Sequence, residues 1–270
     1  MIVAVVQLNS QADVSQNLAR ASEFVRRARK RGAELVVLPE NFAFMGETEE
    51  AKLAVAERVE GEPGPITKAL CALAKAERVA IVAGGMPELS GDAARPFNTS
   101  LFVTPEGVVA GKYRKVHLFD VDLPDGTKAL ESGATSAGSE PAVVVPWSGA
   151  SVGMSICYDL RFPEYFRRLS QGGADVITVP AAFTLTTGKD HWHVLLRARA
   201  IENQCFVLAA AQHGKHPRGR QTYGKSLIVD PWGAVLAEAG EGEGLAVAEL
   251  DFAYLKRVRA SLPCLTHRKF

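Results

Sequence analysis

The stretch IVAVVQLNSQADVSQNLARASEFVRRARKRGAELVVLP, residues 2–39, decides the fold class of this chain. It opens with a continuous β-rich apolar run at residues 2–8, which predicts a buried strand. A helical pattern follows, capped by Asp13 or Ser15 and ended by Gly32. The run at 35–38 is a second buried strand, which Pro39 stops. A strand, a helix and a strand in this order predict an α/β protein with parallel strands.

The rest of the chain continues the alternation and then turns to hairpins. The expected elements are helices near 48–58 and 65–77, a strand at 79–83, a hairpin of 98–104 with 108–113, a polar loop at 117–140, strands at 142–146, 150–156 and 175–179, and closing strands at 205–211, 224–230, 234–237 and 245–249. A further helix is expected to begin at a capping Asp190, with an apolar face of Val194, Leu195, Ala198 and Ile201. No repeat or linker divides the chain, so we predict one domain over residues 1–270. Its parallel units and later hairpins predict an α/β layered sandwich with mixed sheets.

Composition excludes several classes of function. Apolar residues make up 47% of the chain and charged residues 23%, with a net charge of +1. No block of like charge exists, so attraction to nucleic acid or to an anionic membrane is not expected. The four cysteines are far apart and form no C-x-x-C pair, which argues against a disulfide framework or a zinc site. We find neither a signal peptide nor a run of about 20 apolar residues, and expect a cytoplasmic protein.

Cys157 is the first candidate for chemistry. It lies in GMSICYDLRFPE, between the strand at 150–156 and a probable helix opened by Pro163. A side chain at such a turn is held rigidly and exposed at the sheet edge, as in a nucleophile elbow. A nearby helix N-terminus would favour the thiolate. The alternative is a buried structural cysteine.

Three charged residues are candidates to act with it. Glu40 follows the strand at 35–38, at the sheet edge where α/β proteins carry working residues; its alternative is a solvated loop glutamate. Lys115 follows the hairpin in GKYRKVHLFD, and period-two spacing places it on the same face as Tyr113. An inward lysine needs a carboxylate partner; the alternative is a basic edge strand. Glu131, in the polar loop, has a surface glutamate as its alternative.

The histidines give no clear signal. His117, His191 and His193 are the plausible partners for a cysteine nucleophile. His191 and His193 lie two apart on the expected helix and cannot share a face. No metal-ligand spacing such as H-E-x-x-H is present, so no metal is expected.

Taken together, LPENFAF, YRKVHLFD and GMSICYDLRFPE resemble the three signature segments of the nitrilase superfamily, in the order Glu, Lys, Cys. The resemblance runs nearly end to end. It implies a four-layer α-β-β-α sandwich that forms a homodimer through helices. It also implies an amidase that needs no cofactor and acts on a small-molecule amide through a thioester. In that mechanism Glu40 is the general base, Lys115 and the Tyr158 N–H stabilise the oxyanion, Cys157 is the nucleophile, and Glu131 orients the lysine.

The downstream segments HWHVLLRARAIENQCFVLAAAQHGKH, YGKSLIVDPWG and SLPCLTHRKF resemble the branch that acts on deaminated glutathione. One departure is His193, where that branch usually has glutamate. A 2-oxo acid substrate needs a cation, and Arg161 is the first candidate because guanidinium binds carboxylate bidentately; a structural pair with Asp159 or Glu164 is its alternative. The remaining residues expected to line the pocket are Thr184, Thr187, Lys189 and His191, with a helix-entry loop as the alternative for the first three.

Other functions stay open from sequence alone. An ω-amidase acting on 2-oxoglutaramate shares the core motifs. A carbamoylase or aliphatic amidase of the same superfamily is a second possibility, because sequence does not rank close substrates. An inactive binding scaffold is the third, and the intact Glu-Lys-Cys set argues against it.

Overall fold

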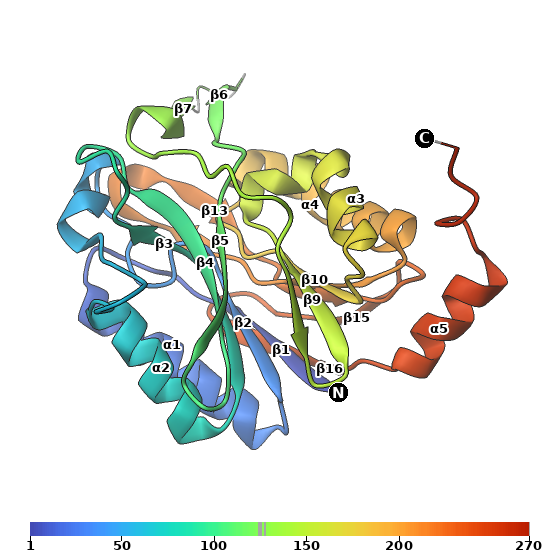
Figure 1. The fold of residues 1–270 in the computed structure, drawn as a ribbon. Helices are drawn as coiled ribbons and strands as arrows, with labels where there is room; N and C mark the ends of the chain where they lie inside the picture. Colours follow the sequence, from blue (N-terminus) through green and yellow to red (C-terminus); the bar gives the residue numbers. More distant parts are fainter. Residues whose placement is uncertain (124–125, 127, 270) are drawn as a thin grey trace.

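Two six-stranded mixed sheets face one another in the computed structural model, which describes residues 1–123, 126 and 128–269 (Figure 1). The first sheet has the order β16-β1-β2-β3-β4-β5 and the second β15-β14-β11-β10-β9-β8. Strands of the first sheet are β1 (Ile2–Gln7), β2 (Leu35–Leu38), β3 (Ala80–Glu88), β4 (Phe97–Val103), β5 (Val109–Arg114) and β16 (Gly244–Glu249). Strands of the second are β8 (Val144–Trp147), β9 (Ala150–Met154), β10 (Val176–Thr178), β11 (Phe206–Ala209), β14 (Leu227–Val229) and β15 (Val235–Glu238).

The centre of each sheet is parallel and its margins are antiparallel. β1, β2 and β3 run parallel, as do β9, β10 and β11. β16 closes the N-terminal strand from the far end of the chain, in antiparallel register from Ile2 with Glu249 to Gln7 with Gly244. The predicted mixed sheets are therefore confirmed.

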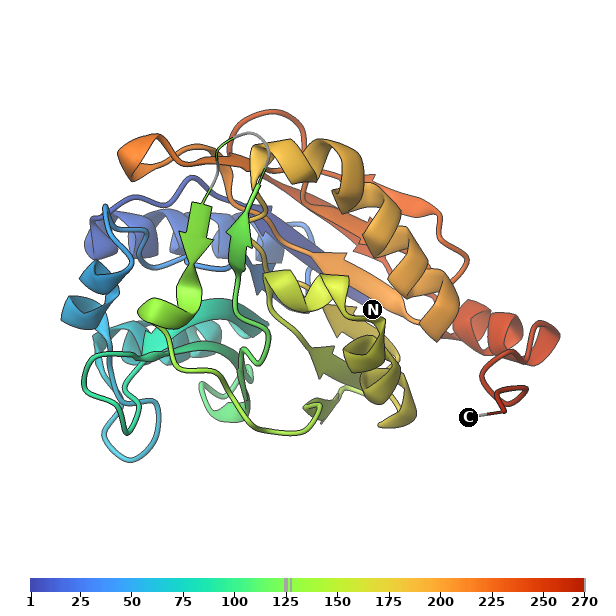
Figure 2. The same cartoon turned by 90° about the horizontal axis from the view of Figure 1, so that it is seen from above.

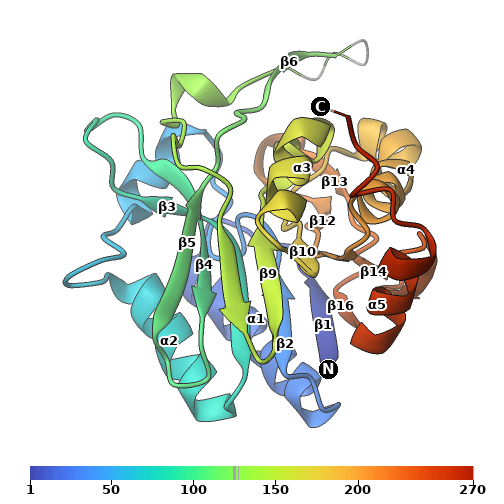
Figure 3. The ribbon, with the colours of Figure 1, turned by 45° about the vertical axis from the view of Figure 1, so that its right-hand side comes forward.

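Helices cover the outer face of each sheet, which gives the four layers seen in Figure 3. The helices are α1 (Val14–Lys30) and α2 (Pro65–Glu77) on the first sheet, α3 (Pro163–Gln171) and α4 (Leu185–Asn203) on the second, and α5 (Phe252–Ser261) at the edge. Along β1, Val3 and Val5 belong to the core between the sheets, and Ala4 and Val6 to the core beneath the helices. Both faces of the strand are buried, and this explains its unbroken apolar run.

Two short hairpins stand on the sandwich: β6 (Asp120–Asp122) with β7 (Lys128–Leu130), and β12 (His213–Lys215) with β13 (Gln221–Tyr223). The first lies over one end of the layers when seen from above (Figure 2). The polar loop expected at 117–140 thus contains a hairpin and the 3₁₀ turn η2 (Glu131–Gly133), while residues 124, 125 and 127 of that expected loop lie outside the described residues. Within the described ranges, no helix is long and apolar enough to cross a membrane.

The helix expected near 48–58 is wrong. Only a 3₁₀ turn, η1 (Glu50–Val55), forms there. The chain then leaves helical geometry because Glu57 has two other roles. Its main chain forms a parallel β-bridge with Glu88, and its carboxylate accepts hydrogen bonds from the Ile66 and Thr67 N–H groups at the start of α2. A side chain that satisfies the free N–H groups of another helix is not visible in sequence periodicity.

The expected start and face of α4 are also wrong. The helix begins at Leu185, after Thr184 rather than Asp190, and Val194 and Ile201 are 65% and 46% exposed. Its buried side carries Trp192, Leu196, Arg199, Ala200 and Asn203. Arg199 is buried because its guanidinium donates to the Leu160 carbonyl oxygen at 2.7 and 3.0 Å. A buried arginine and asparagine disguised the true face in the sequence pattern.

Candidate active site

Cys157 lies directly beyond β9, as the first residue of the 3₁₀ turn η3 (Cys157–Arg161). Its φ is +45°, a left-handed conformation that non-glycine residues adopt at a cost. The Cys157 N–H donates to the Pro180 carbonyl at 2.8 Å, and this bond fixes the turn against the loop after β10. The side chain is 8% exposed. The structure thus has the strand-to-helix elbow that the sequence indicates.

Asp159 holds this elbow from behind. Its carboxylate is fully buried and accepts the Ile156 N–H and the Tyr113 hydroxyl, each at 2.8 Å, on one oxygen. The other oxygen lies 2.7 Å from His117 Nδ1, and the His117 ring stacks on Phe162. Sequence analysis missed Asp159, and the structure assigns His117 to this carboxylate rather than to the thiol.

Lys115 is the centre of a buried ion cluster. It follows β5 and is 2% exposed, with Nζ 3.0 Å from Glu40 Oε1 and 2.8 Å from Glu131 Oε2. Asn98 Nδ2 bridges the same carboxylates, at 2.9 Å from Glu40 and 3.2 Å from Glu131. Removing one partner of such a cluster typically costs about 3–5 kcal/mol, because a buried charge is left uncompensated. Asn98 has no motif of its own in the sequence and was also missed.

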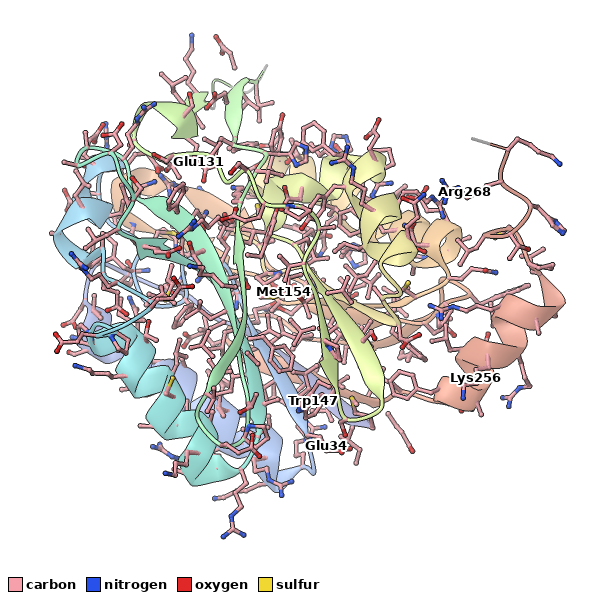
Figure 4. The ribbon with its side chains drawn as sticks, in the orientation of Figure 1. Glu34, Glu131, Trp147, Met154, Lys256 and Arg268 are labelled. Atoms are coloured by element: carbon pink, nitrogen blue, oxygen red, sulfur yellow. The ribbon has the colours of Figure 1, made fainter. Side chains whose placement is uncertain are left out.

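Glu40 joins the two sheets. It follows β2 of the first sheet, yet its Oε2 accepts the N–H of Ala182, which follows β10 of the second sheet, at 2.9 Å. Glu131 directly follows β7, and its Oε2 accepts a hydrogen bond from the Phe119 N–H at 2.7 Å. Figure 4 shows Glu131 near one end of the sandwich, beneath the β6–β7 hairpin. The cluster is therefore assembled from both sheets and one hairpin.

The electrostatics of the cluster differ from expectation at the thiol. Burial raises the pKa of Cys157, and the Glu40 carboxylate raises it further against the opposing effect of Lys115. The expected thiolate-favouring helix terminus is outweighed, and these surroundings favour the protonated thiol. Burial disfavours the Lys115 cation, but Glu131 and Glu40 raise its pKa well above the ordinary value. Lys115 in turn holds the pKa of Glu131 low despite burial.

A cavity of about 490 Å³ opens onto this cluster. Of the residues expected at the site, those that line it are Glu40, Lys115, Glu131, Cys157, Tyr158, Arg161, Thr184 and Thr187. Lys189 and His191 are not among the lining residues. His191 Nδ1 lies 3.2 Å from Arg161 Nη1, beside the wall rather than in it.

Arg161 has aromatic rather than acidic neighbours. Its guanidinium lies 4.9 Å from the centre of the Phe183 ring and 5.9 Å from that of Tyr158. No carboxylate in the part of the chain that the structure describes lies within ion-pair distance of it. The alternative pairing with Asp159 or Glu164 is therefore wrong, and the cation is available to a ligand.

His193 points away from the cavity. Its Nε2 lies 2.8 Å from Glu238 Oε2, and neither residue lines the cavity wall. His193 thus makes an outer contact between α4 and β15. Among residues 1–123, 126 and 128–269, no group of three or more His, Cys, Asp or Glu side chains could hold a metal ion.

Comparison with known proteins agrees with this geometry. The profile described as Carbon-nitrogen hydrolase matches residues 2–260. The chain belongs to this family. A deaminated glutathione amidase from Synechocystis sp. is 48% identical to the hydrolase over 272 residues, covering 100% of this chain and 98% of the relative.

Solved structures extend the comparison. The NitFhit protein of Caenorhabditis elegans superposes on the hydrolase with a TM-score of 0.90 at 40% identity, covering 99% of this chain and 65% of that one. An amidase from Nesterenkonia sp. AN1 superposes with a TM-score of 0.80 at 29% identity, covering 97% and 98%. In that structure acrylamide has added to the active-site cysteine. The predicted four-layer α-β-β-α fold is confirmed. This carbon-nitrogen hydrolase is a cysteine-dependent amidase.

Proposed function

We propose that this hydrolase cleaves the amide bond of deaminated glutathione and releases 2-oxoglutarate and cysteinylglycine. One observation carries the proposal: Glu40, Lys115, Glu131 and Cys157 meet at a single cavity in a chain that is 48% identical, end to end, to a deaminated glutathione amidase. The cavity volume suits a tripeptide-sized ligand, because small-molecule sites typically occupy about 300–1,000 Å³.

Acylation begins with the neutral thiol. Glu40 takes the Cys157 proton as the sulfur attacks the amide carbon, so an S–C bond forms and the carbonyl oxygen becomes negative. The Lys115 ammonium and the Tyr158 N–H stabilise that oxyanion; losing one such donor typically costs about 10²–10³ in rate. The C–N bond then breaks, and Glu40 returns the proton to the leaving amine of cysteinylglycine.

Deacylation uses the same groups. Glu40 takes a proton from a water molecule that attacks the thioester, the S–C bond breaks, and the sulfur regains a proton. Since the pKa of Cys157 is raised by its surroundings, the thiolate is unstable there and reprotonation is favoured.

Glu131 and Asn98 hold Lys115 and Glu40 in position. If Lys115 faced Glu40 alone, its positive charge would weaken Glu40 as a base. The negative charge of Glu131 beside Lys115 reduces this effect. Asn98 donates to both carboxylates and fixes their separation. We assign both as positioning residues.

Arg161 is proposed to bind the carboxylate of the 2-oxo acid end. It lines the cavity four residues after the nucleophile and has no acidic partner in the described ranges. Thr184 and Thr187, whose hydroxyls lie 2.7 Å apart, form the adjoining wall. Lys189 and His191 stand outside the wall, and His191 lies against Arg161.

The test is a substrate comparison. Purified protein should release 2-oxoglutarate from deaminated glutathione without ammonia, and a higher kcat/KM for this compound than for 2-oxoglutaramate is expected. Faster turnover of 2-oxoglutaramate by a wide margin would assign an ω-amidase instead, and preference for carbamoyl or short aliphatic amides a different amidohydrolase. Cys157→Ala protein is the blank.

A homodimer completes the proposal. Exposed Val194 and Ile201 lie on α4, and Arg197 of the same helix donates to the Gly233 carbonyl at 2.7 Å beside exposed Trp232. An apolar face of this kind on a helix is typical of a subunit interface.

Light scattering tests the homodimer. The wild type is expected at twice the chain mass, and Val194→Asp with Ile201→Asp at the chain mass. Leu89→Asp, at an exposed apolar residue just after β3, is the matched control and should stay dimeric. A monomeric wild type at micromolar concentration contradicts the pairing.

A further inference from the structure

The mouth of the cavity is more cationic than the catalytic cluster requires. Six cationic side chains among the described residues line the cavity against four carboxylates: Lys52, Lys115, Lys128, Arg161, Arg218 and Arg220 against Glu40, Glu47, Glu49 and Glu131. Lys115 is ion-paired with the catalytic carboxylates, and Lys128 forms an ion pair with Asp122 at 2.8 Å. Of the other four, Arg161 follows the nucleophile by four residues, and Lys52, Arg218 and Arg220 are called the cationic rim.

A single carboxylate organises two members of the cationic rim. Glu49 lies 2.9 Å from Lys52 Nζ and 2.5 Å from Arg220 Nη2. Burial opposes its ionisation, yet Lys52 and Arg220 lower the pKa of Glu49 to about 2. The contact joins segments 171 residues apart. Lys52, Arg218 and Arg220 face the two carboxylates Glu47 and Glu49, so one positive charge is in excess on this part of the cavity wall.

Arg218 is the unpaired member of the cationic rim. It lies in the 3₁₀ turn η4 (Pro217–Gly219) with φ +59° and ψ +24°, a left-handed conformation that costs a non-glycine residue about 1–2 kcal/mol. No carboxylate in the described part of the chain is within ion-pair distance of its guanidinium. A strained residue that places a free cation at a cavity mouth is a candidate for ligand contact.

The cationic rim and the catalytic cluster line the same cavity. Lys52 donates to Thr135 Oγ1 at 2.7 Å, and its charge contributes to the lowered pKa of Glu131. A two-residue leaving group spans about 7 Å when extended. Cys157, Lys52, Arg218 and Arg220 line one cavity, so a leaving peptide bound there shares its walls with the cationic rim.

We propose that the cationic rim, with Arg218 as its free donor, binds the C-terminal carboxylate of the leaving dipeptide. This inference rests on the proposed function. Deaminated glutathione carries one carboxylate at each end. Among the described residues, two cations of the cavity wall, Arg161 and Arg218, have no acidic partner. Arg161 takes the acyl end and the cationic rim takes the leaving end. The cavity thereby selects amides whose leaving group is a peptide with a free carboxylate.

The experiment compares deaminated glutathione with the same compound carrying a C-terminal carboxamide. Wild-type protein is expected to prefer the free carboxylate by roughly five- to tenfold in kcat/KM, the range for an exposed charge-assisted hydrogen bond. Arg218→Asn keeps a residue that tolerates the left-handed turn and removes the charge. Arg218→Asn with Arg220→Gln should abolish the preference, whereas Arg218→Lys should retain part of it.

The matched control is Lys215→Gln, an exposed lysine of β12 outside the cavity wall, which should keep the full preference. The assay reads a ratio between two substrates, so partial unfolding of a variant does not imitate the result. A wild type with no preference, or a double variant that keeps it, overturns the assignment of the cationic rim. A wild type that fails to cleave deaminated glutathione at all overturns the proposed function and the inference with it.

Discussion

The thiol of Cys157 and the carboxylate of Glu40 determine each other's chemistry. An anion beside a buried thiol opposes thiolate formation, and the structure accordingly raises the pKa of Cys157. These surroundings therefore favour the protonated form of the thiol, which is the form that the proposed acylation step starts from. This arrangement differs from a cysteine kept as a thiolate by a histidine or a helix terminus.

Glu40→Gln is predicted to make the Cys157 thiol more acidic and yet to slow catalysis. Removing the anion should lower the pKa of the Cys157 thiol, because burial is then still opposed by Lys115 and by the Ala182 N–H, and Glu40 no longer adds to the effect of burial. Loss of the base should still reduce kcat/KM by about 10²–10⁴. Iodoacetamide alkylation followed against pH measures the thiol, and turnover measures the base.

Glu47→Gln is the control for this pair of measurements, since Glu47 lines the same cavity from an exposed position. It should change neither the alkylation midpoint nor turnover appreciably. An alkylation midpoint that moves to higher pH in Glu40→Gln would show that Glu40 does not oppose the thiolate.

At the scale of elements, the loop after β10 fixes the relation between the sheets. Pro180 accepts the Cys157 N–H and Ala182 donates to Glu40. Gly84 of β3 lies against this loop, and a Cβ there would overlap the Pro180 ring. Two elements from different sheets thus meet at a contact that only glycine permits.

Gly84→Ala is therefore predicted to destabilise the fold and the site together. The overlap should lower the free energy of unfolding by about 1–3 kcal/mol and displace Pro180, which reduces kcat. Urea denaturation and turnover are the measurements. Gly91→Ala, where no atom lies within 4 Å of the added Cβ, should change stability by no more than about 0.5 kcal/mol. Equal stability and activity of the two variants would contradict the role of Gly84.

At the scale of the whole molecule, neither sheet holds the site by itself. Glu40 and Lys115 follow strands of the first sheet, Cys157 and Ala182 follow strands of the second, and Glu131 comes from beyond the β6–β7 hairpin. The reactive atoms meet only when the sandwich closes. Long-range packing is thus a condition of catalysis, since these segments are far apart in the chain.

The same fact explains what sequence analysis could predict. Glu40, Lys115 and Cys157 each end a strand, so local pattern and family resemblance found them, together with the sheets and most boundaries. Asp159 and Asn98 act through hydrogen bonds to distant groups, and no local signal marks them. The inner face of α4 was misassigned because buried Arg199 and Asn203 carry polar side chains there. The roles of Asp159 and Asn98 and the inner face of α4 depend on contacts with residues distant in the chain, which the pattern of a single sequence does not show.

Acid-quenched mass spectrometry during turnover of deaminated glutathione tests the central claim most directly. The account predicts a 2-oxoglutaryl group on the peptide that contains Cys157, formed before free 2-oxoglutarate and absent from Cys157→Ala protein, which should be inactive. An unmodified Cys157 throughout turnover, together with a Cys157→Ala variant as active as the wild type, would contradict it.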